Sequence, residues 1–399
     1  MLTDWIQQTS DWLVDESLRG TRADRLMKHL CEQMVAGGIP ISRVHIACGQ
    51  LHPLFKAFSV VWSRDDGLVR DRFSYHGAST DAWQQSPLKA VLNVHRTEIR
   101  ARIHLGEGVD EFPVIREFQE RGMTDYLCVR AGFSEPLERA LDELDGCIAS
   151  FSTDAEGGFS DACIQTIKRL FPRLAVALKS LVRETTAQNL ASTYLGSQAG
   201  ERVLRGHIRR GDCDSIRAAV WFSDMRDSTV TADKMDPRIF LERLNRYFEC
   251  TAGSVLDHGG EVLRFIGDAV LAIFPIGGPG GAERAGRMAV SAARDTIRRL
   301  EAINADPPPH DRDPIRFGLG LHVGDVLYGN IGVPERLEFS VIGPTANEVA
   351  RLEDLTKPLD RPILASDAFI ALAHADWEAM GSHRLRGVTE PQPIYALNV

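Results

Sequence analysis

Near the start of the chain, apolar positions recur every three to four residues and then give way to extended runs. Between Thr21 and Val35 the apolar residues form one stripe, which predicts an amphipathic helix capped by Thr21. Asp66-Gly67 separates two extended runs and predicts a hairpin between them. The strands that this pattern predicts lie at 44–48, 55–62, 68–75, 124–131 and 147–153.

A long helical pattern closes the first half of the chain. Ser160 is placed to cap it, the pattern continues to about residue 182, and Pro172 is expected to kink it. A helix, several antiparallel strands and a closing helix together resemble a GAF-type sensor domain over residues 20–183. The resemblance rests on the order of the elements. It implies an α/β sensor and regulatory domain at 1–183 that answers an unknown small-molecule or protein signal.

No motif in this first half identifies a ligand. Its histidines lack the spacing of a metal or haem site, so they are interpreted as packed or solvated side chains. They are His29, His45, His52, His76, His95 and His104. Residues 184–214 follow as a polar helical connector that could transmit a movement between domains. Its basic cluster at 201–210 is interpreted as a solvated face or a dimer contact rather than a nucleic-acid site.

The hydrophobic pattern changes in the second half of the chain. Residues 218–222 form a short, continuous apolar run, as expected of a strand buried on both faces. The run leads into Asp224 and a small polar turn, where a carboxylate can coordinate a cation while backbone N–H groups face phosphate oxygens. Pro237 then opens an amphipathic helix that continues to about residue 256.

A second acidic residue follows in a position that can meet the first. Residues 261–274 predict a tight β-hairpin with Gly267-Asp268 at its tip. If the hairpin pairs beside the strand 218–222, Asp268 and Asp224 converge at one edge of the sheet. Two carboxylates together with ligand phosphates suit Mg²⁺, which rarely occupies an all-protein cage.

Three segments then occur in order along the chain: FSDM at 222–225, GGEVLRFIGD at 259–268 and FSVIGPTANEVAR at 339–351. Together they resemble the catalytic domain of the class III nucleotidyl cyclases, the family that makes cyclic AMP or cyclic GMP. The resemblance covers residues 215–399. It implies a ferredoxin-like α/β (α+β) core that works as a head-to-tail homodimer, with active sites shared across the interface.

The resemblance also assigns roles to individual residues. Asp224 and Asp268 match the metal-binding aspartates of a site that uses two Mg²⁺ or Mn²⁺ ions. Asn347 would orient the ribose, and Arg351 would neutralise charge on the α-phosphate. The implied reaction is attack of the ribose 3′-oxygen of ATP on the α-phosphorus, with pyrophosphate leaving. The remaining contacts that it implies are Arg386 for the terminal phosphates, Ser228 and Thr229 in the phosphate turn, and Met225 for both phosphate and metal.

The residues at the base-recognition positions favour ATP over GTP. Arg264 stands where adenylyl cyclases commonly carry a lysine, and Ser340 occupies the partner position. A guanylyl cyclase would place an acidic acceptor where Arg264 stands, and a guanidinium cannot accept a hydrogen bond. Asp227 replaces a glycine frequent in the first motif, and its charge is expected to weaken nucleotide binding or to raise the demand for metal.

Composition and charge exclude several other classes of protein. The chain has 399 residues, 44% of them hydrophobic, and a formal net charge of −9, which disfavours a polyanion such as DNA as partner. Its longest apolar runs are too short to span a bilayer, its N-terminus lacks a secretory pattern, and its seven scattered cysteines predict no disulfide framework. These features predict a cytoplasmic protein without a transmembrane segment.

Three alternatives remain beside an adenylyl cyclase. A guanylyl cyclase would use the same machinery on GTP. A nucleotide-dependent regulatory protein would keep the binding site without turnover, although the retained Asp224, Asp268, Asn347 and Arg351 argue against it. A diguanylate cyclase is disfavoured because its diagnostic Gly-Gly-Asp/Glu-Glu-Phe turn is missing.

Overall fold

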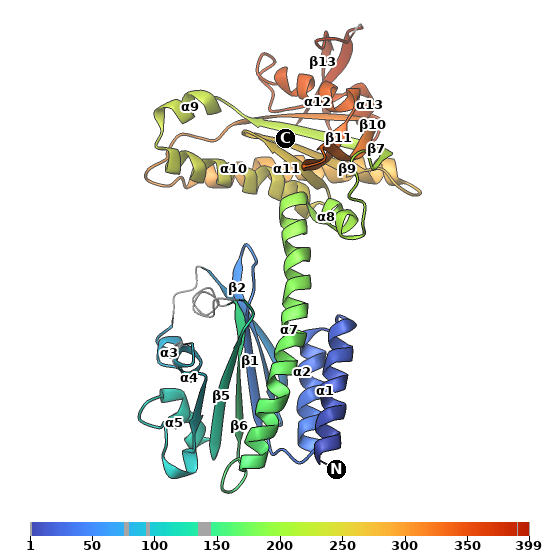
Figure 1. The fold of residues 1–399 in the computed structure, drawn as a ribbon. Coiled ribbons are helices and arrows are strands. Elements are labelled where there is room, and N and C mark those ends of the chain that lie inside the picture. The colour runs from blue at the N-terminus through green and yellow to red at the C-terminus, as the bar shows by residue number, and fades with distance from the viewer. Residues whose placement is uncertain (1, 76–79, 93–95, 135–144, 389, 399) are drawn as a thin grey trace. The chain divides into compact units, whose positions relative to one another are not determined.

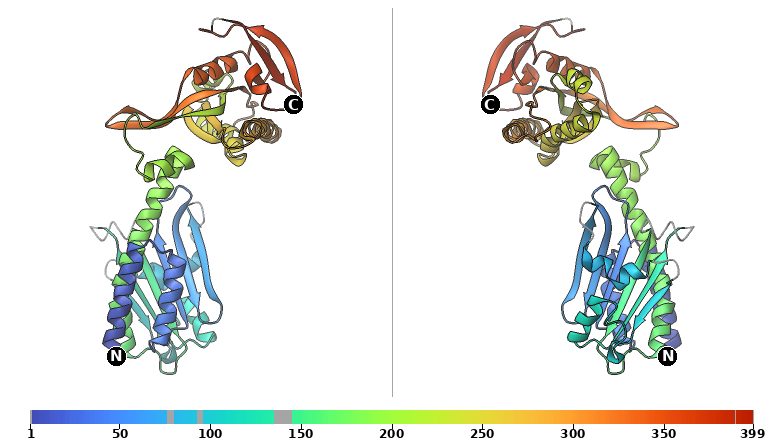
Figure 2. Two further views of the ribbon diagram at one scale, coloured as in Figure 1. Left: turned by 90° about the vertical axis from the view of Figure 1, so that its right-hand side faces the viewer. Right: turned by 90° about the vertical axis from the view of Figure 1, so that its left-hand side faces the viewer.

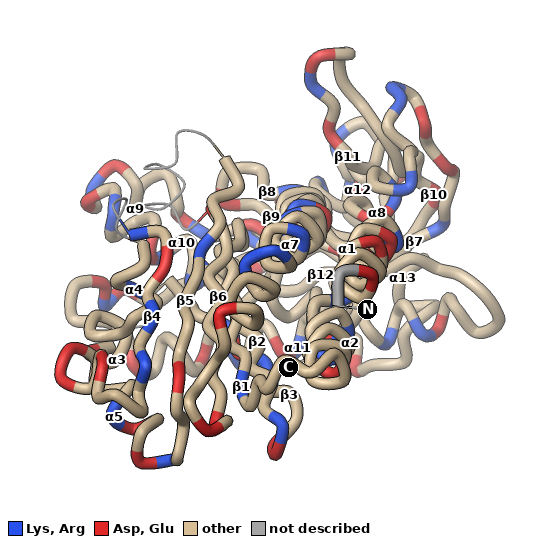
Figure 3. The backbone as a smooth tube through the Cα atoms, turned by 60° about the horizontal axis from the view of Figure 1, so that its bottom comes forward, with Lys and Arg blue, Asp and Glu red and all other residues tan. Residues whose placement is uncertain are grey.

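The computed structural model describes residues 2–75, 80–92, 96–134, 145–388 and 390–398. His76 and His95 therefore lie outside the described residues. Contacts divide the chain into two compact units, Met1–Leu190 and Ala191–Val399. This division falls inside the connector that the sequence predicts. Across the described residues, acidic and basic positions are interspersed along the backbone (Figure 3).

The first unit is built on an antiparallel six-stranded sheet in the order β3-β2-β1-β6-β5-β4. Its strands are β1 (Arg43–Gly49), β2 (Phe55–Ser63), β3 (Gly67–Ser74), β4 (Glu98–Ala101), β5 (Asp125–Gly132) and β6 (Gly146–Thr153). Its helices include α1 (Leu2–Leu18), α2 (Ala23–Ala36), α3 (Asp81–Gln84), α4 (Pro87–Ala90), the 3₁₀ turn η1 (Ile103–Leu105), α5 (Pro113–Glu120) and α7 (Asp161–Leu195).

The two faces of this sheet are covered by different helices (Figures 1 and 2). Along β1, Val44 and Ile46 point into a core that includes α1, α2 and α7. Along β5, Tyr126 and Cys128 point to the opposite face, where a smaller core includes residues of α5. The alternation of strand side chains therefore assigns Arg43 and His45 to the side of α3, α4 and α5.

Most sequence expectations for this unit are confirmed, and the differences concern α2, α1 and α7. All five predicted strands are present, and the Ser160 hydroxyl accepts the Cys163 N–H at the start of α7. Thr21 does not cap α2, which begins at Ala23 without a side-chain cap; its hydroxyl donates to Glu16 instead. Helix α1 was not predicted. Helix α7 contains Pro172 and extends beyond the predicted end at about residue 182 to Leu195, and the kink at Pro172 stays a prediction.

The second unit is a mixed sheet in the order β13-β14-β12-β10-β7-β9-β8, with β11 paired to β10. Its strands are β7 (Cys213–Met225), β8 (Glu261–Ile266), β9 (Ala269–Pro275), β10 (Phe317–Val333), β11 (Arg336–Ile342), β12 (Ile363–Ser366), β13 (Trp377–His383) and β14 (Gln392–Leu397). Its helices are α8 (Ser197–Leu204), α9 (Ser228–Lys234), α10 (Pro237–Asp257), α11 (Gly281–Ala305), α12 (Pro344–Asp354) and α13 (Asp367–Ile370). Together with the first unit, this confirms the mixed α+β class.

Helices cover both faces of the second sheet. Trp221 of β7 packs with α10 and α11 on one face, and its neighbour Val220 packs with α8 and α12 on the other. Helix α12 approaches β10 very closely: a Cβ on Gly320 would lie 2.5 Å from the Val349 carbonyl oxygen, and one on Gly324 would overlap Thr345. The absence of a side chain at these glycines therefore lets α12 pack closely on β10. Helix α12 consequently lies near the end of β7.

Helix α8, which precedes β7, packs against the sheet of the second unit, whereas the sequence suggested a solvated basic segment there. The Arg202 guanidinium lies over the rings of Tyr328 and Phe339, 5.4 and 5.7 Å from their centroids, and pairs with Asp214. Arg202 is therefore not part of a purely solvated basic cluster. All seven cysteines are free thiols, and within the described part of the chain no helix is both long and apolar enough to cross a membrane.

Candidate active site

The two aspartates of the predicted metal pair lie at one edge of the second sheet. Asp224 is the penultimate residue of β7, and Asp268 is in the turn between β8 and β9, next to Gly267 with its positive φ of 64°. Strand β9 pairs antiparallel with β7, with Val270 opposite Ser223. This register carries the hairpin tip to the point where β7 ends.

The carboxyl groups of Asp224 and Asp268 lie close enough to interact directly. Burial, the contact with Asp268 and the charge of Glu353 raise the pKa of Asp224 to about 7. The Oδ2 atom of Asp268 is buried and has no hydrogen-bond partner among the described residues. Two carboxylates in contact repel each other unless a proton or a cation lies between them. The pair therefore fits a divalent cation, whose other ligands must be phosphate, water or backbone oxygens such as that of Met225.

We expect Asp224→Asn to stabilise the metal-free chain, and to do so more at about pH 8 than at about pH 5. With its folded-state pKa raised to about 7 from the ordinary 3.8, Asp224 binds its proton more tightly when folded, so stability falls as the pH rises from 4 to 7. The amide removes that loss. Thermal unfolding in the presence of a chelator measures the difference between variant and wild type; an equal difference at both pH values would contradict the prediction.

A third carboxylate lies close by, and sequence reasoning missed it. Glu353 of α12 is buried and accepts a hydrogen bond of 3.2 Å from the Thr356 hydroxyl. Burial is the main reason that the pKa of Glu353 is raised to about 7, and the charge of Asp268 contributes. Gly318 of β10, which is opposite Asp224 in the register, leaves the room for this side chain. The signal in the sequence is a glutamate four residues after Val349, on the buried stripe of an amphipathic helix.

The predicted phosphate turn leads from β7 into α9. Met225 is buried, and Ser228 and Thr229 form the first turn of α9. Asp227 precedes them with a φ of 59°, a left-handed conformation that explains why a glycine suits this position. Its carboxylate pairs with Arg316 at 3.0 Å and with Lys357 at 3.6 Å. These two cations offset the negative charge that the sequence suggested would weaken nucleotide binding.

The predicted transition-state residues lie on α12, four positions apart. Asn347 is exposed, and the Arg351 guanidinium lies against Gly387, so that a Cβ there would be 3.4 Å from its Nη1. Arg386 is exposed and lies in a turn between β13 and β14. The β13–β14 connection thus brings the segment 385–387 beside Arg351, and two cationic residues belong to one region.

The two base-recognition candidates belong to β8 and β11, which lie near each other without pairing in the sheet. Arg264 of β8 pairs with Glu338 of β11, and the Arg264 Nε is buried without a hydrogen-bond partner among the described residues. Ser340 is buried two residues after Glu338 and is therefore on the same face of β11. Sequence reasoning missed Glu338, which adds an acceptor to a set that otherwise offers a guanidinium and a hydroxyl.

Comparisons with known proteins identify this half of the chain. The family model described as "Adenylate and Guanylate cyclase catalytic domain" matches residues 214–396. An uncharacterized protein of Mycobacterium tuberculosis is 30% identical over 211 residues, which are 52% of this chain and 36% of that protein. "Adenylate cyclase 1" of Rhizobium meliloti is 29% identical over 178 residues, 44% of this chain and 26% of that protein. The chain thus spans about a third or less of the length of these curated relatives.

Solved structures include similar chains. A bacterial light-regulated adenylyl cyclase aligns over 60% of this chain and 66% of its own, with 23% identity and a TM-score of 0.47. The guanylyl cyclase Cya2 aligns over 46% of this chain and 93% of its own, with 27% identity and a TM-score of 0.41. The GAF-type resemblance of residues 20–183 stays a prediction. The family match establishes that residues 214–396 form a class III adenylate and guanylate cyclase catalytic domain.

Proposed function

We propose that this protein is an adenylyl cyclase that converts ATP to 3′,5′-cyclic AMP and pyrophosphate. The observation that carries the proposal is the contact between Asp224 and Asp268, with a buried Asp268 oxygen that lacks a partner among the described residues. Such a pair is costly to keep unless it binds cations, and the family match supports a nucleoside triphosphate as the companion ligand. Two Mg²⁺ or Mn²⁺ ions held there would lower the pKa of the ribose 3′-hydroxyl and offset charge on the leaving pyrophosphate.

The chain's own residues position the nucleotide. Asn347 orients the ribose so that its 3′-oxygen lies in line with the α-phosphorus, and Arg351 stabilises charge that grows on the α-phosphate. Arg386 binds the terminal phosphates, and its place in an exposed turn beside Arg351 supports that role. Met225, Ser228 and Thr229 contribute backbone and hydroxyl groups from the turn after β7.

We propose that the active form is a head-to-tail homodimer. The chain carries both the aspartate pair and the Asn347/Arg351 pair, so two identical chains can form two equivalent composite sites. Activity therefore does not require a heterodimer in which each chain has lost some of these catalytic residues. We further propose that the enzyme works in the cytoplasm, where ATP is available, and that the first unit regulates it.

The choice of base depends on Arg264, Glu338 and Ser340. Arg264 can donate to the N1 atom of adenine, and the Ser340 hydroxyl can accept from its 6-amino group. Guanylyl cyclase activity is the second candidate, because the Glu338 carboxylate could accept from the N1–H and 2-amino groups of guanine. The ion pair with Arg264 occupies that carboxylate, which favours ATP.

Product analysis tests the proposal directly. The full-length chain is incubated with equal concentrations of ATP and GTP in the presence of Mn²⁺, and the cyclic nucleotides are quantified by mass spectrometry. We expect cyclic AMP to exceed cyclic GMP by about tenfold, in line with the discrimination that one or two base contacts supply. Predominant cyclic GMP would establish the guanylyl cyclase instead, and no cyclic product at high enzyme concentration would leave a nucleotide-binding regulatory protein.

The variant Glu338→Gln refines this test. Removing the carboxylate frees the Arg264 guanidinium and deletes the one acceptor suited to guanine, so we expect any cyclic GMP formation to fall while cyclic AMP formation persists. The matched control is Glu335→Gln, in the turn before β11, which should leave the product ratio unchanged. A rise in cyclic GMP for Glu338→Gln would contradict the assignment of this acceptor.

A further inference from the structure

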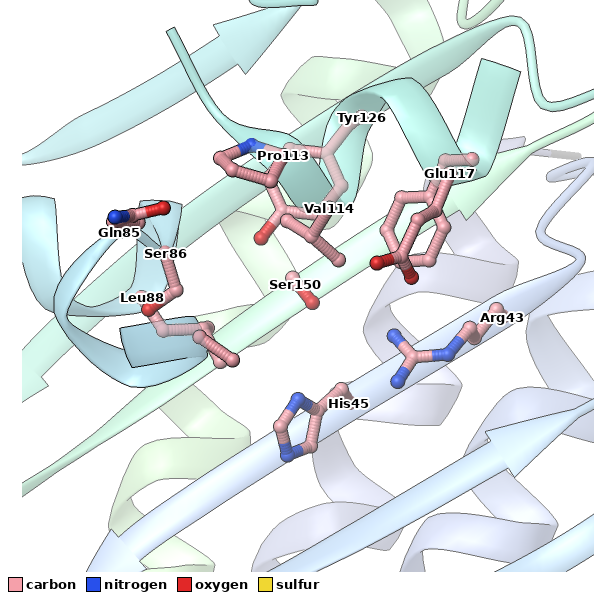
Figure 4. A pocket seen from close by; sticks show the side chains of 12 residues that line it. Arg43, His45, Gln85, Ser86, Leu88, Pro113, Val114, Glu117, Tyr126 and Ser150 are labelled. Carbon is pink, nitrogen blue, oxygen red and sulfur yellow. The ribbon is translucent and has the colours of Figure 1, made fainter. Parts of the chain in front are cut away.

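A cavity of about 190 Å³ lies in the first unit, on the face of the sheet that α3, α4 and α5 cover (Figure 4). Its floor is made by β1, β5 and β6, which contribute Arg43, His45, Tyr126 and Ser150. The helices contribute apolar side chains such as Leu88 and Val114. The floor therefore carries polar groups, and the helices add apolar side chains together with Gln85, Ser86 and Glu117, a mixture typical of a small-molecule site.

Arg43 is the one lining residue that carries a positive charge, and no carboxylate of the described residues forms an ion pair with it. Its guanidinium is half-buried, lies 5.3 Å from the centre of the Phe118 ring and points into the cavity (Figure 4). Burial lowers the pKa of Arg43 from its ordinary value, yet a guanidinium stays charged at neutral pH. A partly buried cation without a carboxylate partner is costly, and a bound anion would offset that cost.

His45 is a second group without a partner. Its Nε2 atom is buried and has no hydrogen-bond partner among the described residues. Burial and the nearby charge of Arg43 lower the pKa of His45 to about 4, so the imidazole is neutral and can donate one hydrogen bond. Ser150 is directly opposite His45 in the β1–β6 register, and its hydroxyl lines the same floor.

The charge and shape of the cavity define the ligand. One guanidinium balances one negative charge, and its planar pair of N–H groups matches a carboxylate. His45 and Ser150 supply neutral polar contacts, and the apolar side chains of Leu88 and Val114 suit a hydrocarbon or aromatic body. Glu117 also lines the cavity, but its carboxylate is exposed and would repel an anion, most strongly a doubly charged one.

We propose that this cavity binds a small monocarboxylate with an apolar body. The carboxylate pairs with Arg43 and accepts a hydrogen bond from His45, while the body contacts Leu88 and Val114. The proposal stands on the cavity and on its two unpartnered polar groups, and it does not depend on the reaction of the second unit. It gives the first unit a ligand chemistry that the sequence did not indicate.

Calorimetric titration of the full-length chain tests the proposal with three probes. Benzoate is the monocarboxylate, benzyl alcohol is its neutral counterpart of similar shape, and phenyl phosphate carries a second charge. We expect benzoate to bind about tenfold or more tightly than benzyl alcohol and more tightly than phenyl phosphate. Equal binding of benzoate and benzyl alcohol, tighter binding of phenyl phosphate, or no benzoate binding would each overturn the proposal.

Two variants separate the charge contact from general disruption of the fold. Arg43→Met keeps an apolar stem over Phe118 and should weaken benzoate by about tenfold or more, without weakening benzyl alcohol. Glu117→Gln changes an exposed side chain and should strengthen benzoate severalfold, because it removes the repelling charge. An unchanged benzoate affinity in Arg43→Met, or a weaker one in Glu117→Gln, would refute the proposed contact.

Discussion

Asp268→Asn is expected to lower the rate of cyclic nucleotide formation by at least about a hundredfold, because it removes one of the two charges that hold the cations. The substitution keeps the size of the side chain and sits in a turn whose backbone depends on Gly267, so the hairpin should still form. It also removes the repulsion between two carboxylates in contact, so the metal-free variant should unfold no more easily than the wild type. Turnover with Mn²⁺-ATP and the thermal midpoint are measured on the same preparation.

Asp233→Asn provides the matched control for that experiment. Asp233 is an exposed aspartate on α9 in the same unit, and its substitution removes the same charge from the chain. If both variants lost activity equally, the loss would reflect the total charge of the domain rather than the cation site. Retained turnover in Asp268→Asn, with normal activity of the control, would refute the metal assignment.

The position of the aspartate pair was predictable because it follows from local patterns. A buried apolar run ending at Asp224 and a two-residue turn at Gly267-Asp268 each identify their element from a few neighbouring residues. Only one further assumption was needed to bring the carboxylates together, namely that the hairpin strand pairs beside β7. Strand β9 does pair antiparallel with β7. Other elements defined by short-range periodicity were found in the same way, with α1 as an exception.

The missed residues depend on contacts between segments far apart in the sequence. Glu353 meets the aspartates because glycines on β10 let α12 approach, and Glu338 meets Arg264 because β11 lies beside β8. In the first unit, Arg43 and His45 belong to a strand in which buried and less buried residues clearly alternate. That alternation does not predict that the face with Arg43 and His45 lines a cavity. Sequence patterns give the face of an element; which side chains from other elements share that face is a property of the tertiary fold.

Mixing two inactive variants should restore activity if the sites are shared between chains. Asp224→Ala leaves Asn347 and Arg351 intact, and Arg351→Ala leaves the aspartate pair intact. Random pairing makes half of the dimers mixed, and each mixed dimer contains one complete site and one that lacks both groups. Equal amounts of the two variants should therefore recover about a quarter of the wild-type activity, as a two-fold symmetric dimer requires.

The amount recovered distinguishes a shared site from one contained in a single chain. If Asp224 and Arg351 acted on the same nucleotide within one chain, no mixture could contain an intact site, and activity would stay at the level of the single variants. A mixture of Asp224→Ala with Asp268→Ala is the matched control: both lack the same half-site, so even exchanged dimers should remain inactive. If activity recovers in the mixture with Arg351→Ala and not in the mixture with Asp268→Ala, each site combines the aspartates of one chain with the Arg351 guanidinium of its partner. Equal activities in the two mixtures would exclude the composite site.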